Sequence, residues 1–309
     1  MPAKALLVGI NGYAKVPLRG CVNDVVQVRD LLTQRYRLAD DRIRFITDAA
    51  ATKAAIADGL RWLAQTDPGE TTPVRLFHFS GHGVFTPDND HDEQDGRDEC
   101  LVPVDYQTAG YIADDTLHES YARFSADTHL LLLMDCCHSG GSQKDIANDI
   151  VYRYLRGTDE EEAHLNKQIE TAAQRNRELK AAFVRDSMTE LLQHEAGSMS
   201  ESELDRRIKA VIDQFDKIHY GLEAMPGNAT LIAACRADQV AADARFDESY
   251  HGALTYYLTE ALAGAGGQMP YSALIKQVGQ AMGGQFTQVP QLECSKEHMD
   301  LPFLRDAIG

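Results

Sequence analysis

The chain has 309 residues, of which 44% are apolar and 25% are charged, so it can bury a sizeable core and is neither disordered nor fibrous. Its 47 acidic and 30 basic residues give a net charge of −17. This charge argues against nucleic acids and anionic membranes as partners, because binding to both depends on Lys and Arg neutralising phosphate. No apolar run reaches the ~18 residues of a membrane helix, and the first run is too short for a secretory signal. With six cysteines, too few for a disulfide framework in a chain this long, we expect free thiols and a cytoplasmic protein.

Segments typical of strands and helices alternate in the first half of the chain. Short apolar runs predict strands, and apolar residues at helical spacing predict the helices between them. The predicted strands are residues 5–10, 42–47, 74–79 and 130–134, and the predicted helices are residues 22–36, 52–64 and 116–123. This order predicts an α/β fold with a mostly parallel sheet sandwiched by helices, in which active groups gather at the carboxyl ends of the strands.

A charged segment interrupts this pattern. Residues 156–225 contain 10 basic and 15 acidic residues and neither Pro nor Cys, and they predict two or three amphipathic helices. The sheet then resumes, with a strand at 229–234, helices at 254–262 and 269–282, and an edge strand at 288–292 that contains Pro290. We therefore predict about six central strands. The predicted parts are a catalytic region at 1–155, a helical insertion at 156–225, and a region at 226–309 that completes the same domain.

Two of the predicted strands are followed by residues that can carry chemistry. The third strand leads to His82, and the fourth leads to Cys137. The carboxyl ends of neighbouring parallel strands lie side by side, so the histidine and the cysteine can meet there. A thiol needs a nearby base to become a good nucleophile, and an imidazole can serve as that base and later protonate the leaving amine.

The motifs around these two residues resemble a known family. Phe-Ser-Gly-His82-Gly, followed 55 residues later by Asp-Cys-Cys137-His-Ser-Gly, is similar to the motifs of prokaryotic-type metacaspases, a branch of the caspase-like cysteine peptidases. Three further segments in the same order agree: Leu18-Arg-Gly-Cys-Val-Asn-Asp24, Asp98-Glu-Cys-Leu-Val-Pro-Val-Asp105 and Gln288-Val-Pro-Gln-Leu292. The resemblance spans the chain except residues 156–225. It implies a caspase-like fold.

The resemblance also implies catalytic roles. His82 would be the general base and acid. Cys137, rather than Cys136, would be the nucleophile, because it immediately precedes His-Ser-Gly. The backbone N–H groups of Gly83 and Cys137 would form the oxyanion hole. The reaction would form an acyl-enzyme that water then hydrolyses.

Two aspartates predict the substrate class. Asp135 precedes Cys137 by two residues, and Asp24 follows the first strand, so both should reach the same edge of the sheet. Two carboxylates beside a thiolate require a cation between them, which a substrate Arg or Lys supplies. The resemblance likewise implies that Asp24 and Asp135 line the S1 pocket, with Cys21 and Ser80 as neighbours. The alternative for Asp24 is a residue that only stabilises a helix N-terminus.

The sequence supports a calcium site less strongly than it supports the catalytic pair. Residues 86–99 hold seven acidic residues, but Glu93 stands where an EF-hand loop needs Gly, so we interpret them as a solvated acidic loop. The resemblance implies a different calcium site with four carboxylate ligands: Asp98, Asp114, Asp115 and Asp145. The alternative for the middle pair is that they simply begin the helix predicted from residue 116.

The insertion suggests a means of control. In the family the linker after the nucleophile strand often contains cleavage sites after Arg or Lys. The chain offers ten such residues here: Arg153, Arg156, Lys167, Arg175, Arg177, Lys180, Arg185, Arg206, Arg207 and Lys209. The segment can be cut by the enzyme itself, be cut by an activating protease, bind a regulator, or be a passive insertion.

Together these observations predict a monomeric cysteine endopeptidase that cleaves proteins after Arg, and also Lys. The alternatives are a catalytically latent signalling scaffold on the same fold and a calcium-responsive binding module.

Overall fold

The computed structural model describes residues 3–88, 90, 93, 95–137, 150–194, 200–219, 228–236 and 239–304. The chain divides into two compact units. The α/β unit comprises residues 1–84, 99–156 and 225–309, and the helical unit comprises residues 85–98 and 157–224. Within the described parts of the chain, no helix is both long and apolar enough to cross a membrane.

A six-stranded sheet forms the centre of the α/β unit. Its strands, in spatial order, are β12 (Gln291–Cys294), β9 (Ala229–Ala233), β7 (His129–Asp135), β3 (Val74–Ser80), β1 (Ala3–Gly9) and β2 (Ile43–Thr47). Neighbouring strands are parallel except β12, which runs antiparallel to β9 at the edge. The predicted α/β fold with a mostly parallel sheet is therefore confirmed. The last strand starts after Pro290 rather than before it, because proline has no N–H to donate to the neighbouring strand.

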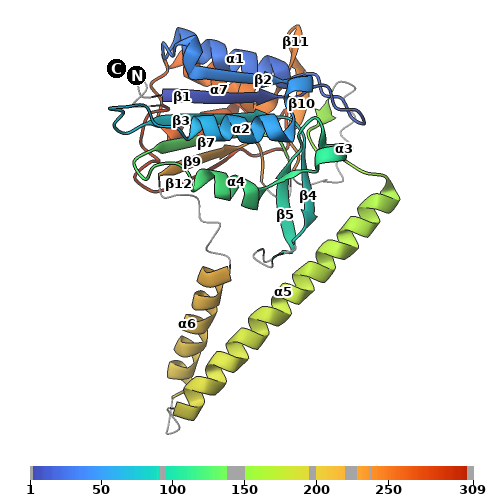
Figure 1. The fold of residues 1–309 in the computed structure, drawn as a ribbon, viewed down its shortest axis with the longest axis vertical. Coiled ribbons are helices and arrows are strands. Elements are labelled where there is room, and N and C mark those ends of the chain that lie inside the picture. The colour runs from blue at the N-terminus through green and yellow to red at the C-terminus, as the bar shows by residue number, and fades with distance from the viewer. Residues whose placement is uncertain are drawn as a thin grey trace. The chain divides into compact units, whose positions relative to one another are not determined.

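Helices cover both faces of this sheet. They are α1 (Cys21–Gln34), α2 (Lys53–Leu63), α4 (Asp114–Tyr121), α7 (Ala253–Gly264) and α8 (Tyr271–Met282), with a single turn at α3 (Tyr106–Ala109). Helix α7 contacts both α1 and α8, whereas α2 contacts α4. Figure 1 shows α2 and α4 on the side of the sheet that faces the viewer. Strands β1, β3 and β7 are buried along their whole length, as expected when helices cover both faces of a sheet.

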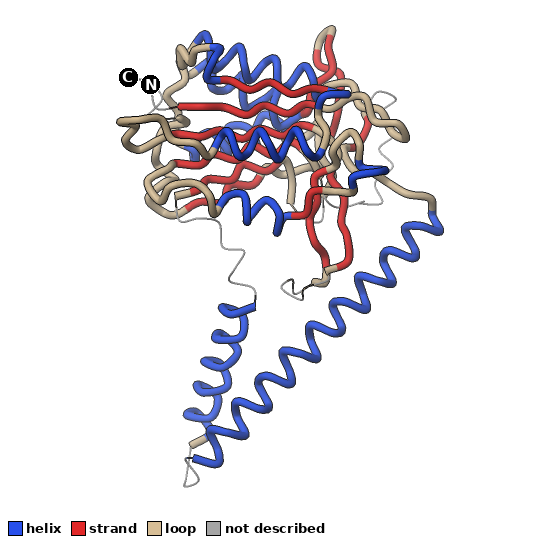
Figure 2. The backbone as a smooth tube through the Cα atoms, in the orientation of Figure 1, coloured by secondary structure: helices blue, strands red, loops and turns tan. Residues whose placement is uncertain are grey.

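Six short strands were not predicted (Figure 2). One small sheet consists of β8 (Val151–Tyr152), β10 (Ala242–Phe246) and β11 (Ser249–Gly252), and another of β4 (Gly83–Pro87), β5 (Arg97–Leu101) and β6 (Ile112–Ala113). Strands of two to five residues give too few alternations for sequence periodicity to detect. They matter for function because β4 and β10 follow the carboxyl ends of β3 and β9, where the site residues lie.

The helical unit contains two long helices. They are α5 (Asp159–His194) and α6 (Glu201–His219), so the prediction of two or three helices is confirmed. The rings of Phe183 and Phe215 lie 5.3 Å apart between them. The tip of the β4–β5 hairpin belongs to the same unit: Gly96, at φ +75°, approaches Ala173 of α5 so closely that a Cβ would collide with its backbone.

Candidate active site

The motif residues that suggested catalysis follow neighbouring strands. Strands β3 and β7 are parallel, and their last residues, Ser80 and Asp135, are partners in the register. His82 and Cys137 each stand two residues beyond these partners. The topology therefore brings the two motifs to one edge of the sheet, as the sequence predicted.

A buried acidic pocket lies at this edge, and it holds an arginine from the same chain. Arg153 has no solvent exposure. Its Nη2 donates to Oδ2 of Asp24 at 2.7 Å, and its Nη1 donates to Oγ of Ser80 at 2.7 Å. Its guanidinium also lies 3.2 Å from Oδ1 of Asp135 and 3.2 Å from Oδ1 of Asp243. Three carboxylates thus surround one cation out of contact with water.

Backbone and side-chain donors hold the carboxylates in place. Asp24 accepts from the N–H of Gly252 at 3.0 Å and faces Nδ1 of His251 at 3.1 Å. Asp135 accepts from both the N–H and the hydroxyl of Thr255, at 2.9 and 2.6 Å. Gly252 leaves room for the pocket, because a Cβ there would overlap Asp135 and the bound guanidinium.

The charges in the pocket depend on one another. Burial alone would raise the pKa of Asp24, but Arg153 and the hydrogen bond from His251 lower it below its usual range. The pKa of Asp135 is raised, first by burial and then by the nearby Asp24, in spite of Arg153. Burial opposes the charge on Arg153, but the surrounding carboxylates raise its pKa. The guanidinium is thus the cation that allows several carboxylates to share a dry pocket.

The backbone around Arg153 is held at both ends. Its carbonyl oxygen accepts from the N–H groups of Gly83 at 2.9 Å and Cys137 at 3.4 Å. Its N–H donates to the carbonyl of Ala241 at 3.0 Å, and the N–H of Leu155 donates to the carbonyl of Gly83 at 3.0 Å. Strand β8, just before it, pairs antiparallel with β10. The two N–H groups predicted as an oxyanion hole therefore converge on one carbonyl oxygen, that of Arg153.

The imidazole of His82 is almost wholly buried beside this peptide. Its Nε2 lies 2.7 Å from the carbonyl oxygen of Val16, and its ring packs on Tyr13 with centroids 4.6 Å apart. Its Nδ1 is shielded from solvent and has no hydrogen-bond partner among the described residues. Burial lowers the pKa of His82 to about 4, against the opposing effects of Val16 and the backbone of Arg153. The ring is therefore neutral at pH 7 and can accept a proton.

The thiol of Cys137 has other neighbours. It is 1% exposed, accepts a hydrogen bond from the N–H of Ala241, and lies 3.6 Å from the sulfur of Cys235. Burial raises its pKa well above the ordinary value, and the hydrogen bond with Cys235 raises it further. In the described part of the chain no hydrogen bond joins the thiol to His82. The thiol of Cys137 is thus neutral in this arrangement.

The structure describes three of the four predicted calcium ligands. Both carboxylate oxygens of Asp114 accept backbone N–H groups, from Glu99 at 3.0 Å and from Asp115 at 3.1 Å. Asp114 and Asp115 are the first residues of α4, as their alternative interpretation expected. Asp98 belongs to the helical unit, and Asp145 lies outside the described residues. The four-carboxylate set therefore stays a prediction.

A different carboxylate group lies within the helical unit. Oxygen atoms of Asp88, Asp90 and Asp98 fall within 4.8 Å of one another, a spacing that suits a hard cation. Asp88 is 2% exposed and accepts from Nδ2 of Asn176 on α5 at 2.5 Å. The interpretation of residues 86–99 as a solvated acidic loop is therefore correct only in part: Asp90 and Asp95 are exposed, whereas Asp88 and Asp98 are buried.

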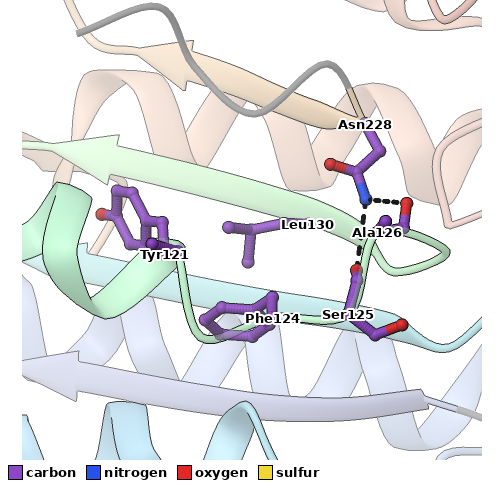
Figure 3. Close-up of a pocket in the computed structure, with 7 residues that line it drawn as sticks. Tyr121, Phe124, Ser125, Ala126, Leu130 and Asn228 are labelled. Atoms are coloured by element: carbon purple, nitrogen blue, oxygen red, sulfur yellow. Dashed lines mark hydrogen bonds between the residues drawn. The ribbon is translucent and has the colours of Figure 1, made fainter. Parts of the chain in front are cut away.

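A cavity in the α/β unit lies apart from these groups (Figure 3). It is lined by Tyr121, Phe124, Leu130 and Asn228, at the start of β7 rather than its end. The side-chain amide of Asn228 donates to the carbonyl of Ala126 at 2.7 Å and braces this loop. Ligands of parallel α/β sheets bind at the opposite end of the strands, so the cavity is not the active site.

Several residues of the pocket were not predicted. Asp243, His251 and Thr255 all come from the small sheet around β10 and from the start of α7. Arg153 was noted only as one of ten basic residues. The available signal was the alternation of apolar and charged residues along Ala242–Phe246, which could have identified a strand with Asp243 on the face opposite Ala242 and Ala244.

Comparison with known proteins identifies the family. A family model described as "Metacaspase, peptidase C14 domain" matches residues 3–145. Metacaspase-1B of Aspergillus oryzae is 31% identical over 306 residues, which cover 94% of this chain and 67% of that protein. Metacaspase-1 of Schizosaccharomyces pombe is 30% identical over 311 residues, with the same coverage of 94% and 67%.

Solved structures agree on the fold. A protein from Geobacter sulfurreducens (GSU0716) matches with a TM-score of 0.60 at 19% identity, covering 97% of each chain. Caspase-1 from Spodoptera frugiperda matches with a TM-score of 0.53 at 10% identity, covering 95% of this chain and 86% of that one. The predicted caspase-like fold is therefore confirmed. The chain belongs to the metacaspases, a family of cysteine-type peptidases that act on proteins.

Proposed function

We propose that this chain is an endopeptidase that cleaves after arginine, and less efficiently after lysine, with Cys137 as nucleophile and His82 as base and acid. One observation carries the proposal. Arg153 is bound with its guanidinium among three carboxylates and its carbonyl oxygen on the N–H groups of Gly83 and Cys137. A substrate arginine needs the same two recognition elements.

The pocket favours arginine over lysine on geometric grounds. A guanidinium is a planar fork that reaches several acceptors at once, whereas an ammonium is a compact charge on a flexible stem. Here the two Nη atoms reach acceptors on Asp24, Ser80 and Asp243. Lysine can satisfy only some of them, so its kcat/KM should be lower. An acidic side chain at the same position would meet only like charges.

The reaction would proceed in two halves. Neutral His82 takes the proton of the Cys137 thiol as the sulfur attacks the carbonyl carbon, and the N–H groups of Gly83 and Cys137 stabilise the oxyanion. The imidazolium then protonates the leaving amine, which leaves an acyl-enzyme. Water, deprotonated by His82, hydrolyses this thioester and restores the thiol. The N–H of Cys137 already contacts the carbonyl oxygen of Arg153, so the backbone of Cys137 lies next to the carbonyl that is attacked. A change of the Cys137 side-chain rotamer would then bring its sulfur to the carbonyl carbon.

Reporter peptides test this proposal directly. Three peptides are compared, with Arg, Lys or Asp before the scissile bond. The Arg peptide should be cleaved with the highest kcat/KM, the Lys peptide with a lower one, and the Asp peptide should not be cleaved. The Cys137→Ala variant should have no activity, whereas Cys294→Ala, which alters a half-buried cysteine on β12, should retain it. Cleavage of the Asp peptide, or activity that survives Cys137→Ala, would contradict the proposal.

Calcium activation is a separate part of the proposal. The group formed by Asp88, Asp90 and Asp98 is the better candidate for the ion, because one oxygen atom from each lies within 4.8 Å of the others. Calcium should raise the melting temperature of Cys137→Ala protein, and Asp88→Asn should abolish that rise. An unchanged melting temperature at millimolar calcium would remove the ion from the proposal and would also exclude the calcium-responsive binding module.

The latent scaffold remains the second candidate, and one observation favours it: the thiol of Cys137 faces Cys235 and makes no described hydrogen bond to His82. Folded protein that cleaves no reporter after proteolytic removal of residues 157–224 would support it.

We also propose that the protein is monomeric. Sedimentation at a mass near twice 34.2 kDa would contradict this.

A further inference from the structure

We infer that the chain cuts its own Arg153–Tyr154 bond, and that residues 150–155 close the active site until this cut is made. The inference rests on the proposed function and goes beyond it, because it selects one bond among the basic residues near the insertion. It is carried by the way the backbone on both sides of Arg153 is held.

The residues before the bond are bound as a strand. Val151 and Tyr152 pair antiparallel with Asp243 and Ala242 of β10, and the N–H of Arg153 donates to the carbonyl of Ala241. Extended peptides are commonly recognised by adding a strand to a sheet edge in this way. The pairing fixes the register, so that the side chain of Arg153, rather than that of a neighbour, enters the acidic pocket.

The residues after the bond are bound as well. Tyr154 forms a bridge with Gly83, and the N–H of Leu155 donates to the carbonyl of Gly83 at 3.0 Å. Tyr154 and Leu155 are only 7% and 6% exposed. The chain therefore crosses the site from one side to the other, with the Arg153 carbonyl on the two N–H donors and the imidazole of His82 beside its peptide. Arg156, three residues on, is exposed, whereas Arg153 is fully buried.

The cut would follow the steps proposed for other substrates. The Cys137 sulfur bonds to the Arg153 carbonyl carbon, the C–N bond to Tyr154 breaks, and His82 passes the thiol proton to the Tyr154 nitrogen. Water then cleaves the thioester, which leaves a carboxylate on Arg153 and an amino group on Tyr154. Both new ends are charged in a buried site, and this desolvation cost favours their departure. The empty pocket can then accept substrate.

Intact mass and N-terminal sequencing of the whole chain test the inference. Wild-type protein should yield a fragment that begins at Tyr154, whereas Cys137→Ala and Arg153→Gln should lack it. Arg153→Lys should produce it more slowly. The matched control, Arg156→Gln, removes the nearest other arginine and should be cut as wild type is.

The outcomes separate this inference from the proposed function. Protein that hydrolyses the Arg reporter but stays intact at Arg153–Tyr154, or is cut only elsewhere, overturns the inference and leaves the function standing. Protein that cleaves neither its own chain nor the reporter overturns both. Cleavage of Arg153→Gln after residue 153 would also overturn it, because the guanidinium would then play no part.

A second proposal rests on a different contact. We propose that Cys137 and Cys235 form a reversible disulfide that protects and silences the nucleophile. Their sulfur atoms lie 3.6 Å apart, and both thiols are free. Cys235, in the loop after β9, is half-buried and can meet a small oxidant, whereas Cys137 is 1% exposed. A bond needs the sulfurs to approach to ~2 Å, which rotation about the side-chain bonds can provide.

The oxidant would be a peroxide. The Cys235 sulfur attacks one oxygen of hydrogen peroxide, the O–O bond breaks, and a sulfenic acid and one water result. The Cys137 sulfur then attacks the Cys235 sulfur, the S–O bond breaks, and a second water leaves with the thiol proton. In total two thiols are oxidised to one disulfide while one peroxide is reduced to two waters. A thiol reductant reverses the change by disulfide exchange.

Mass spectrometry tests this proposal without relying on activity. After peroxide treatment and alkylation, a linked peptide pair containing Cys137 and Cys235 should appear, with a loss of two hydrogens. It should persist in Cys294→Ser, which alters another half-buried cysteine, and be absent from Cys235→Ser. Reductant should restore activity to the oxidised wild type. In Cys235→Ser peroxide should cause no loss of activity that reductant reverses, because this disulfide cannot form. Absence of this linked pair, or a link to Cys136 instead, would overturn the proposal.

Discussion

The acidic pocket around Arg153 and the thiol of Cys137 lie at the same edge of the sheet. They differ in whether their polar groups form ion pairs and hydrogen bonds with one another. In the pocket, the guanidinium of Arg153 contacts three carboxylates, and these accept further hydrogen bonds. At the thiol, burial keeps both Cys137 and His82 uncharged, and the described residues show no hydrogen bond between them. The groups of the pocket are therefore paired with one another, whereas the thiol and the imidazole are not, in the part of the chain that the structure describes. Substitutions in the two regions should change different measurements.

The largest effect is expected from Asp24→Asn. This change keeps the shape of the side chain but removes the charge that Nη2 of Arg153 contacts at 2.7 Å. Removing one partner of a buried ion pair costs about 3–5 kcal/mol, so kcat/KM for the Arg reporter should fall roughly 10²- to 10⁴-fold. The rate at which iodoacetamide alkylates Cys137 should stay the same.

The control for this change is Asp30→Asn, on the same helix but with a side chain that is 46% exposed. It should leave both measurements unaltered. A comparable loss of activity in Asp30→Asn would mean that net charge, rather than the pocket, governs arginine binding. An altered alkylation rate in Asp24→Asn would mean that the two regions are coupled.

A smaller loss is expected from Gly252→Ala. The added methyl group would overlap Asp135 and a guanidinium bound in the pocket. Overpacking of this kind costs about 1–3 kcal/mol, or roughly a 10- to 100-fold loss of kcat/KM for the Arg reporter. The Lys reporter should lose less, because an ammonium is narrower. Gly264→Ala, where nothing lies within 4 Å of the added methyl, is the control. Equal losses for Arg and Lys would indicate a general distortion instead.

The two regions also differ in how far the sequence predicts them. The alternation of strands and helices predicts that His82 and Cys137 follow strand ends, and a parallel sheet brings such ends together whatever the details. Asp24 and Asp135 follow from the same rule. Arg153 and Asp243 do not, because their positions depend on the two-residue strand β8 pairing with β10, about 90 residues away. Such pairing is decided by tertiary contacts, which a local pattern does not contain.

Acidity should affect stability through the buried histidines. Burial lowers the pKa of His78 to about 4, from 6.5 for a solvated histidine. Between these values the unfolded chain binds a proton that the folded chain does not, so the free energy of unfolding falls as the pH drops. From about pH 7.5 to about pH 5 this residue should account for a loss of about 2 kcal/mol.

Urea unfolding of His78→Gln at the two pH values measures this loss, on a Cys137→Ala background that prevents self-cleavage. Glutamine keeps a donor for the carbonyl of Leu133, which Nδ1 of His78 contacts at 2.9 Å, but does not titrate. The variant should therefore lose about 2 kcal/mol less than its parent. His164→Gln, at an exposed position on α5, should match the parent. If His78→Gln also matches it, the buried imidazole does not control the pH dependence.

The smallest effect is expected from Ser80→Ala. The hydroxyl of Ser80 donates to Asp24 at 2.8 Å and accepts from Arg153 at 2.7 Å, but both charged groups keep other partners without it. Loss of such a hydrogen bond costs about 1 kcal/mol, which is roughly a fivefold rise in KM for the Arg reporter. Because this hydroxyl touches the guanidinium rather than the reacting atoms, kcat should not change. A fall in kcat at constant KM would mean that the end of β3 positions His82, two residues on, and that recognition and reactivity are joined through the strand itself.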